Sequence, residues 1–215
     1  MSDKGREMKA EYKSPHRSKR KSRRYIFVVT SLILIIALLF GNAAYRAAKE
    51  KYLLYNYPLK YEEYVEKYSK ENGVDKFLIY AIIKTESNFN SNAVSNVGAR
   101  GLMQIMDETF QWVRYRLSDS DETEYGTMFD PEQNIRYGSY LIGYLLNYFG
   151  SMDEAVCAYH AGAGSVDSWP QNSKYSKDGK ALDTIPASDT KHYLNKIKDA
   201  LKKYQKIYTE DNKNA

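Results

Sequence analysis

The sequence predicts a mainly α-helical domain preceded by a single N-terminal transmembrane helix. Three observations predict this fold class: a long uncharged apolar run near the start, apolar residues at three-to-four spacing through most of the remainder, and almost no alternating strand pattern. The 215 residues leave room for one or two domains. A single cysteine, Cys157, excludes an internal disulfide, and we expect it to be a small core residue.

The positive charge is confined to the first 24 residues, which form a basic tail. This segment holds ten basic and three acidic side chains, whereas the rest of the chain holds 22 basic and 24 acidic side chains. The remainder therefore lacks the basic excess that a phosphate backbone needs. We expect no nucleic-acid partner.

Residues 25–45 are the predicted transmembrane anchor. No residue between Arg24 and Arg46 is charged, and 21 helical residues rise about 31 Å, close to the hydrocarbon thickness of a bilayer. Lys and Arg stay on the cytoplasmic side. The sequence therefore predicts a single-pass protein of the cell membrane, with residues 1–24 in the cytoplasm and the folded domain outside.

A cleaved secretory signal is the alternative for the same segment. Residues 26–40 have the length of a signal core, and small residues follow at Gly41 and Ala43. The long basic tail and the uncharged sequence up to Tyr45 favour an uncleaved anchor. Both interpretations export the folded domain.

The rest of the chain divides into a stalk, a domain and a tail. Residues 46–60 are polar and tyrosine-rich and are predicted to form the stalk, residues 61–208 the domain and residues 209–215 a flexible tail. Within the domain, caps and apolar spacing predict five helices. The first covers residues 61–72 and ends at Gly73, and the second is capped by Asp75 and buries Leu78, Ile79, Ile82 and Ile83. The third runs from Asp130-Pro131 to about residue 148, the fourth is capped by Ser151, and the fifth covers residues 188–208. Residues 102–106 are the one short candidate strand.

Glu86 is the candidate for acid chemistry. It lies four residues after Ile82 and three after Ile83, so it extends the apolar face of its helix. Burial and the negative end of the helix dipole both disfavour the carboxylate, which predicts a raised pKa and a proton still available near neutral pH. A structural glutamate, hydrogen-bonded to Ser87 or to nearby backbone, is the alternative.

Four motifs in order place Glu86 in a known context. They are AIIKTESNF at residues 81–89, SNVGARGLMQIM at 95–106, Asn134-Ile135 with Gly138 and Tyr140-Leu141, and AYHAGAGSV at 158–166. Over residues 61–208 the chain resembles the soluble lytic transglycosylase (SLT) family, whose catalytic domain has a goose-lysozyme-like helical fold.

The resemblance implies an enzyme that cleaves the β-1,4 bond between MurNAc and GlcNAc in peptidoglycan without water and leaves a 1,6-anhydro-MurNAc end. It implies that Glu86 is the single catalytic acid/base, with glycan strands as the substrate and no cofactor or metal. The residues implied to bind substrate are Ser87, Ser95, Met103, Gln104, Tyr159, His160 and Tyr193. For Met103 and Tyr193, core packing is an open alternative.

The sequence departs from the family pattern at several positions. The family usually has asparagine where His160 stands and proline where Asp107 stands, and Asp189-Thr190-Lys191-His192-Tyr193 resembles its Glu-Thr-Arg-x-Tyr. His160 is expected to donate a hydrogen bond to substrate or to backbone, and Asp107 to cap a helix.

Three alternatives stay open. One is a hydrolytic muramidase on the same fold, and another is a catalytically inactive glycan-binding or scaffold protein of a cell-wall or secretion complex whose partners the sequence does not identify. The third concerns Asp119, Asp121, Thr123 and Asp130, which have the spacing of a calcium loop. Glu124 replaces the glycine that such a loop needs, so an acidic surface loop is expected.

Overall fold

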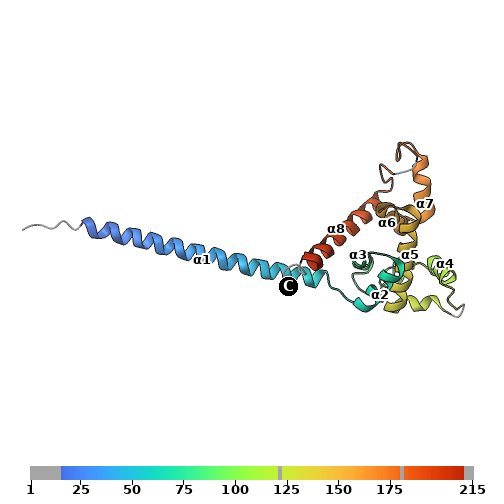
Figure 1. The fold of residues 1–215 in the computed structure, drawn as a ribbon, viewed down its shortest axis with the longest axis horizontal. Helices are drawn as coiled ribbons and strands as arrows, with labels where there is room; N and C mark the ends of the chain where they lie inside the picture. The colour runs from blue at the N-terminus through green and yellow to red at the C-terminus, as the bar shows by residue number, and fades with distance from the viewer. Residues whose placement is uncertain (1–15, 121–122, 180–181, 211–215) are drawn as a thin grey trace, which may run out of the picture. The chain divides into compact units, whose positions relative to one another are not determined.

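A computed structural model describes the backbone of residues 16–120, 123–179 and 182–210, and side chains from residue 23 up to residue 209 within those ranges (Figure 1). The chain separates into two compact units, Met1–Leu53 and Leu54–Ala215. The expectations for residues 1–15 and 211–215 lie outside the described part of the chain.

The first unit consists of most of one long helix, α1, which runs from His16 to Asn56. Within it, Arg23–Asn56 is long and apolar enough to cross a membrane. Its apolar side chains are exposed in the structure, for example Leu38 at 72%. The helix continues beyond residue 45 through most of the predicted stalk, because residues 46–56 contain no glycine or proline that would end it.

The second unit is built from helices. In chain order they are α2 (Glu62–Asn72), α3 (Lys76–Glu86), α4 (Asp107–Leu117), the short 3₁₀ helix η1 (Tyr125–Phe129), α5 (Pro131–Phe149), α6 (Met152–Ala161), α7 (Ala163–Ser168), η2 (Trp169–Gln171) and α8 (Ser188–Glu210). In place of the candidate strand at residues 102–106, the structure has turns with isolated bridges from Arg100 to Val94 and Ile105.

The predicted helix ends are confirmed. Gly73 closes α2 with φ of 65°, a left-handed conformation that glycine adopts without strain. The Asp75 side chain accepts from the Phe77 N–H at 2.8 Å, and that of Asp130 accepts from Gln133 at 2.9 Å. Ser151 caps α6 through the Glu154 N–H. These capping side chains set where the three helices begin.

The prediction that Asp107 caps a helix is wrong by one residue. The N-cap of α4 is Met106, in extended conformation, and Asp107 is the first helical residue. The first helical position is also the one that proline favours, so proline and aspartate fit there for different reasons. Asp107 places its negative charge at the positive end of the helix dipole.

Helix α5 is the centre of the domain. It packs against α2, α4, α6 and η1, while α3 packs along α8 (Figure 1). The predicted apolar faces are buried, including Ile82, Ile83, Ile142 and Ile197, each with no exposed surface. Cys157 is 1% exposed and is a core residue as predicted. This packing brings the end of α3, the start of α8 and the end of α6 together.

Candidate active site

Glu86 is the last residue of α3 and is half-buried. Its helix presents a continuous buried face from Leu78 to Ile83, which directs the following turn toward the core. The side chain is therefore neither sealed in the core nor fully exposed to solvent. Ser87 follows Glu86 in the sequence, and its hydroxyl donates to the carbonyl of Leu102 at 2.8 Å rather than to Glu86.

Two tyrosines from other helices surround the Glu86 carboxyl group. Tyr193 of α8, 7% exposed, donates its hydroxyl to Glu86 Oε1 at 2.6 Å. Tyr159 of α6 donates to the carbonyl of Met103 at 2.8 Å and lies close enough that the charge of Glu86 raises its pKa. The packing of α3, α6 and α8 thus assembles three of the predicted site residues.

The pKa of Glu86 is raised to about 7. Burial of the carboxyl group is the main cause, and the hydrogen bond from Tyr193 opposes it by stabilising the carboxylate. Both tyrosines have pKa values well above the ordinary one, first because they are buried and then because Glu86 is near. They therefore stay neutral hydrogen-bond donors at physiological pH.

The loop from Gly101 to Ile105 forms the other side of the site, and Asn134 of α5 holds it. The Asn134 side chain has no exposed surface; its oxygen accepts from the Met103 N–H at 2.7 Å, and its nitrogen donates to the carbonyls of Arg100 (3.0 Å) and Met128 (2.9 Å). Its amide is thus bonded through both its oxygen and its nitrogen. Asn134 lies within one of the four sequence motifs, but the sequence alone does not predict this role for it. The sequence feature that could indicate this role is an amide side chain in the first turn of α5, directly before the buried Ile135.

Two glycines let this loop pack tightly. Gly101 has φ of 78°, and a Cβ there would collide with the Met128 carbonyl and the Asn134 side chain. A Cβ at Gly138 of α5 would collide with the side chain of Met103. The close approach of the loop to α5 explains why both positions lack a side chain.

The structure places Met103 in the core. Its side chain has no exposed surface and packs over Gly138, while its backbone bonds to Asn134 and Tyr159. A side chain without exposed surface cannot contact a glycan in this conformation. Met103 therefore supports the site from beneath, which agrees with the core alternative.

Ser95 and Gln104 shape the backbone around the site. The Ser95 hydroxyl accepts from the N–H groups of Val97 (3.3 Å) and Ala99 (3.0 Å). Gln104 has φ of 50° and donates its amide to the carbonyls of Ala93 (3.2 Å) and Gly101 (2.8 Å). A left-handed conformation outside glycine costs about 1–3 kcal/mol, so this turn is maintained by its surroundings.

His160 lies at the end of α6, against α8. Its Nδ1 is 3.2 Å from Thr190 Oγ1, and its ring stacks on that of Tyr193 with centroids 4.5 Å apart. Neither contact is with backbone. His160 thus joins the group formed by Glu86, Tyr159 and Tyr193.

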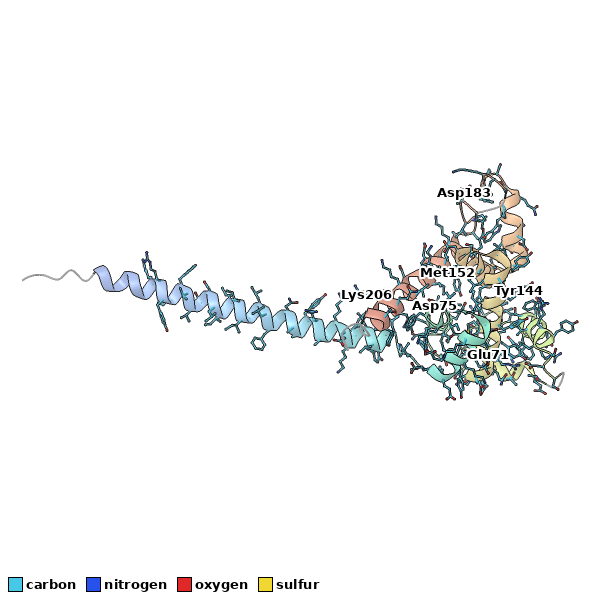
Figure 2. The ribbon with its side chains drawn as sticks, in the orientation of Figure 1. Glu71, Asp75, Tyr144, Met152, Asp183 and Lys206 are labelled. Carbon is cyan, nitrogen blue, oxygen red and sulfur yellow. The ribbon has the colours of Figure 1, made fainter. Side chains whose placement is uncertain are left out.

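A groove of about 480 Å³ is lined by residues of α4, α5 and the end of α6, among them Tyr159 and His160 of this group. Met106, Trp112 and Tyr144 also line it (Tyr144 is labelled in Figure 2). The groove walls combine aromatic faces with polar groups, a composition typical of ligand sites. The sequence alone does not identify Met106 or Trp112 as site residues, because nothing in their local spacing distinguishes them from core residues.

The acidic segment after α4 has structural roles where it is described. Both carboxylate oxygens of Asp119 accept from Arg136 at 2.7 Å, one of them also accepts from Tyr137, and Asp130 caps α5. Asp121 lies outside the described residues. Two of the four residues with the spacing of a calcium loop, Asp119 and Asp130, therefore make other contacts.

Known proteins resemble this chain in sequence. The soluble lytic murein transglycosylase of Salmonella typhimurium is 34% identical over 143 residues, 66% of this chain and 22% of that relative. The membrane-bound lytic murein transglycosylase C of Serratia proteamaculans is 33% identical over 168 residues, 68% of this chain and 47% of that relative. The chain thus spans about half or less of the length of these relatives.

Solved structures resemble the fold. An inactive mutant of the lytic transglycosylase Slt from Pseudomonas aeruginosa, with glutamine replacing a glutamate, superposes with a TM-score of 0.63 at 28% identity, covering 72% of this chain and 25% of that one. The 70 kDa soluble lytic transglycosylase of Escherichia coli superposes with a TM-score of 0.63 at 30% identity, covering 71% and 25%. The expected lysozyme-like helical domain is confirmed.

A model of the transglycosylase SLT domain family matches residues 63–182, which include Glu86, the loop held by Asn134, and Tyr159. The match covers more than half of the 215 residues. The chain belongs to the transglycosylase SLT domain family.

Proposed function

We propose that the protein is a membrane-anchored lytic transglycosylase of peptidoglycan, with Glu86 as its single catalytic acid/base. The observation that carries the proposal is a half-buried carboxyl group with a pKa of about 7 that accepts a hydrogen bond from Tyr193. Its neighbour Tyr159, whose pKa the charge of Glu86 also raises after burial, lines a groove. The named relatives are lytic murein transglycosylases, and a glutamate-to-glutamine mutant of one similar protein is inactive.

Protonated Glu86 would donate to the glycosidic oxygen as the MurNAc–GlcNAc bond breaks. The resulting carboxylate would then take the proton of the C6 hydroxyl of the same MurNAc, whose oxygen attacks C1 and closes the 1,6-anhydro ring. Between these steps the Tyr193 hydroxyl stabilises the carboxylate through its hydrogen bond. A pKa near 7 allows Glu86 to act as acid first and as base afterwards.

The electrostatics around Glu86 support a mechanism with one carboxyl group. Its pKa responds to burial and to the neutral Tyr193, and among the described residues no second carboxylate contributes to the shift. Most hydrolytic glycosidases use two carboxyl groups about 5–9.5 Å apart. An internal hydroxyl nucleophile removes the need for the second, because it is already held within reach of C1.

The other predicted site residues take supporting roles in this proposal. Tyr159 and His160 line the groove, and Tyr159 would contact the sugar together with Met106 and Trp112. Ser87, Ser95 and Gln104 hold the backbone around the carboxyl group. Residues 25–45 would anchor the domain outside the membrane, with the basic tail in the cytoplasm.

Digestion of purified peptidoglycan by the full-length protein in detergent tests the proposal, with mass spectrometry of the sugar ends. We expect 1,6-anhydro-MurNAc ends, and a loss of activity of at least about a thousandfold in Glu86→Gln. Reducing MurNAc ends would instead identify a muramidase. Binding without cleavage would identify a scaffold protein.

A further inference from the structure

His160 connects a buried threonine to the partner of the catalytic carboxyl group. Thr190 of α8 is 1% exposed and contacts His160 Nδ1 at 3.2 Å through its hydroxyl. The imidazole ring then lies against the Tyr193 ring, with an angle of 28° between the two planes. The Tyr193 hydroxyl in turn donates to Glu86 at 2.6 Å. A continuous series of contacts therefore runs from Thr190 to Glu86.

The ring contact restricts Tyr193 where its position matters. A change in the χ1 angle of Tyr193 would move the phenol oxygen away from Glu86, and a stacked ring on its face blocks that movement. The Thr190 contact fixes the plane of the imidazole, so the stacking surface itself is held in place. A smaller side chain at position 160 would leave this face of Tyr193 uncovered.

We infer that His160 is a positioning residue that acts on Glu86 through Tyr193, by holding the phenol hydroxyl against the carboxylate. This inference rests on the proposed function, and it gives His160 a role separate from contact with the sugar. Asparagine at this position, as in the usual family pattern, would present no ring to Tyr193.

Several titratable or polar groups surround His160 and enter any test by pH. Thr190 and Tyr193 face it from α8, Tyr159 precedes it on α6, and Glu86 lies beyond Tyr193 on α3. Glu108 of α4 shares the groove with it. Because Tyr193 stabilises the carboxylate form of Glu86, a displaced Tyr193 leaves Glu86 protonated to higher pH.

Three substitutions separate positioning from contact with substrate. His160→Ala removes the ring, His160→Phe keeps the ring without the nitrogen that contacts Thr190, and His192→Ala is the matched control, since His192 is exposed on α8. We expect His160→Ala to lower kcat about tenfold, the size of one lost hydrogen bond, with KM changed less than about twofold. The alkaline limb of its pH–rate profile should move to higher pH.

His160→Phe should recover most of the lost kcat, and His192→Ala should match the unchanged protein. In a Tyr193→Phe background, His160→Ala should have no further effect on kcat, because the hydroxyl that it positions is already absent. An equal loss in both backgrounds, or a raised KM at constant kcat, would overturn the inference and assign His160 to substrate contact. If the wild-type protein itself has no lytic activity, the proposed function is refuted instead.

Discussion

Glu86 is subject to two opposing influences whose balance sets its pKa. Burial favours the protonated form, and the Tyr193 hydroxyl favours the carboxylate. The first influence was predictable, because the spacing from Ile82 and Ile83 placed the carboxyl group on an apolar face. The second was not, since Tyr193 follows Glu86 by 107 residues and only the packing of α3 against α8 brings them together.

Replacing Glu86 with glutamine should stabilise the protein above neutral pH. The folded pKa of about 7 exceeds the ordinary value of 4.5, so ionisation of Glu86 costs folded-state stability, and this cost grows as pH rises from 4.5 to 7. Relative to the wild-type protein, the free energy of unfolding of Glu86→Gln should be up to about 3 kcal/mol more favourable at pH 8 than at pH 4, at 1.36 kcal/mol per pKa unit. Urea denaturation of both proteins at the two pH values measures this, and a pH-independent difference would contradict the assigned pKa.

Tyr193→Phe tests the two proposed roles of Glu86, first as acid and then as base. Without the hydroxyl, the carboxylate loses its donor, so the pKa of Glu86 rises further and the alkaline limb of the pH–rate profile moves upward. We expect kcat to fall about tenfold to a hundredfold, because the step that needs the carboxylate loses stabilisation. A profile that keeps its alkaline limb would show that Tyr193 serves only packing.

Among the helices of the domain, capping residues and apolar spacing predicted α2, α3, α5, α6 and α8, with starts within one residue of those observed. The short helix α7 was not predicted, and α1 extends beyond the predicted residues 25–45 at both ends. The loop from Gly101 to Ile105 could not be predicted in the same way. Its shape depends on Asn134, which lies more than 30 residues away in sequence, and on the lack of side chains at Gly101 and Gly138. Local patterns carry no information on such long-range hydrogen bonds.

Asn134→Ala should destabilise the domain by roughly 2–4 kcal/mol. The substitution leaves the Met103 N–H and the Met128 carbonyl without their Asn134 partner, and each unpaired group costs about 1–3 kcal/mol before relaxation. The Arg100 carbonyl loses one donor but still accepts from the Ile105 N–H. Asn147→Ala, at an exposed position of the same helix, is the control and should change stability by less than about 0.5 kcal/mol. Equal unfolding midpoints for the two variants would refute the role of Asn134.

The segment after α1 is part of the domain rather than a free linker. The hydroxyl of Tyr204 donates to the Pro58 carbonyl and that of Tyr208 to the Tyr57 carbonyl, while the Tyr57 ring meets the Tyr204 ring edge-on at 5.4 Å. The predicted start at residue 61 leaves these contacts out, because they join residues about 150 positions apart.

Tyr57→Ala should therefore lower stability by about 1–3 kcal/mol, through lost aromatic packing and loss of the cationic contacts from Lys84 and Lys203. Tyr55→Ala is the control, since Tyr55 is 84% exposed. Thermal unfolding of the full-length variants in detergent measures both. If Tyr57→Ala and Tyr55→Ala unfold at the same temperature, residues 57–59 act only as a linker.

At the scale of the whole molecule, the proposal places an enzyme domain outside a membrane that its N-terminal helix crosses. The orientation follows from the charge asymmetry, with a net charge of +7 over residues 1–24. Protease added to intact spheroplasts should digest the domain and leave a tag at the N-terminus protected until detergent is added. Protection of the domain would contradict the orientation, and a mature protein beginning near residue 44 would contradict an uncleaved anchor.

The proposed mechanism requires that the carboxyl group at position 86 still holds its proton near neutral pH. Carbon-13 NMR of the full-length protein with labelled glutamate carboxyl groups tests it directly, with the signal assigned by its disappearance in Glu86→Gln. We expect the Glu86 carboxyl signal to titrate with a midpoint near pH 7. A midpoint near the ordinary value of 4.5 would mean that Glu86 is ionised before it meets the glycan, and the proposed acid step would be untenable.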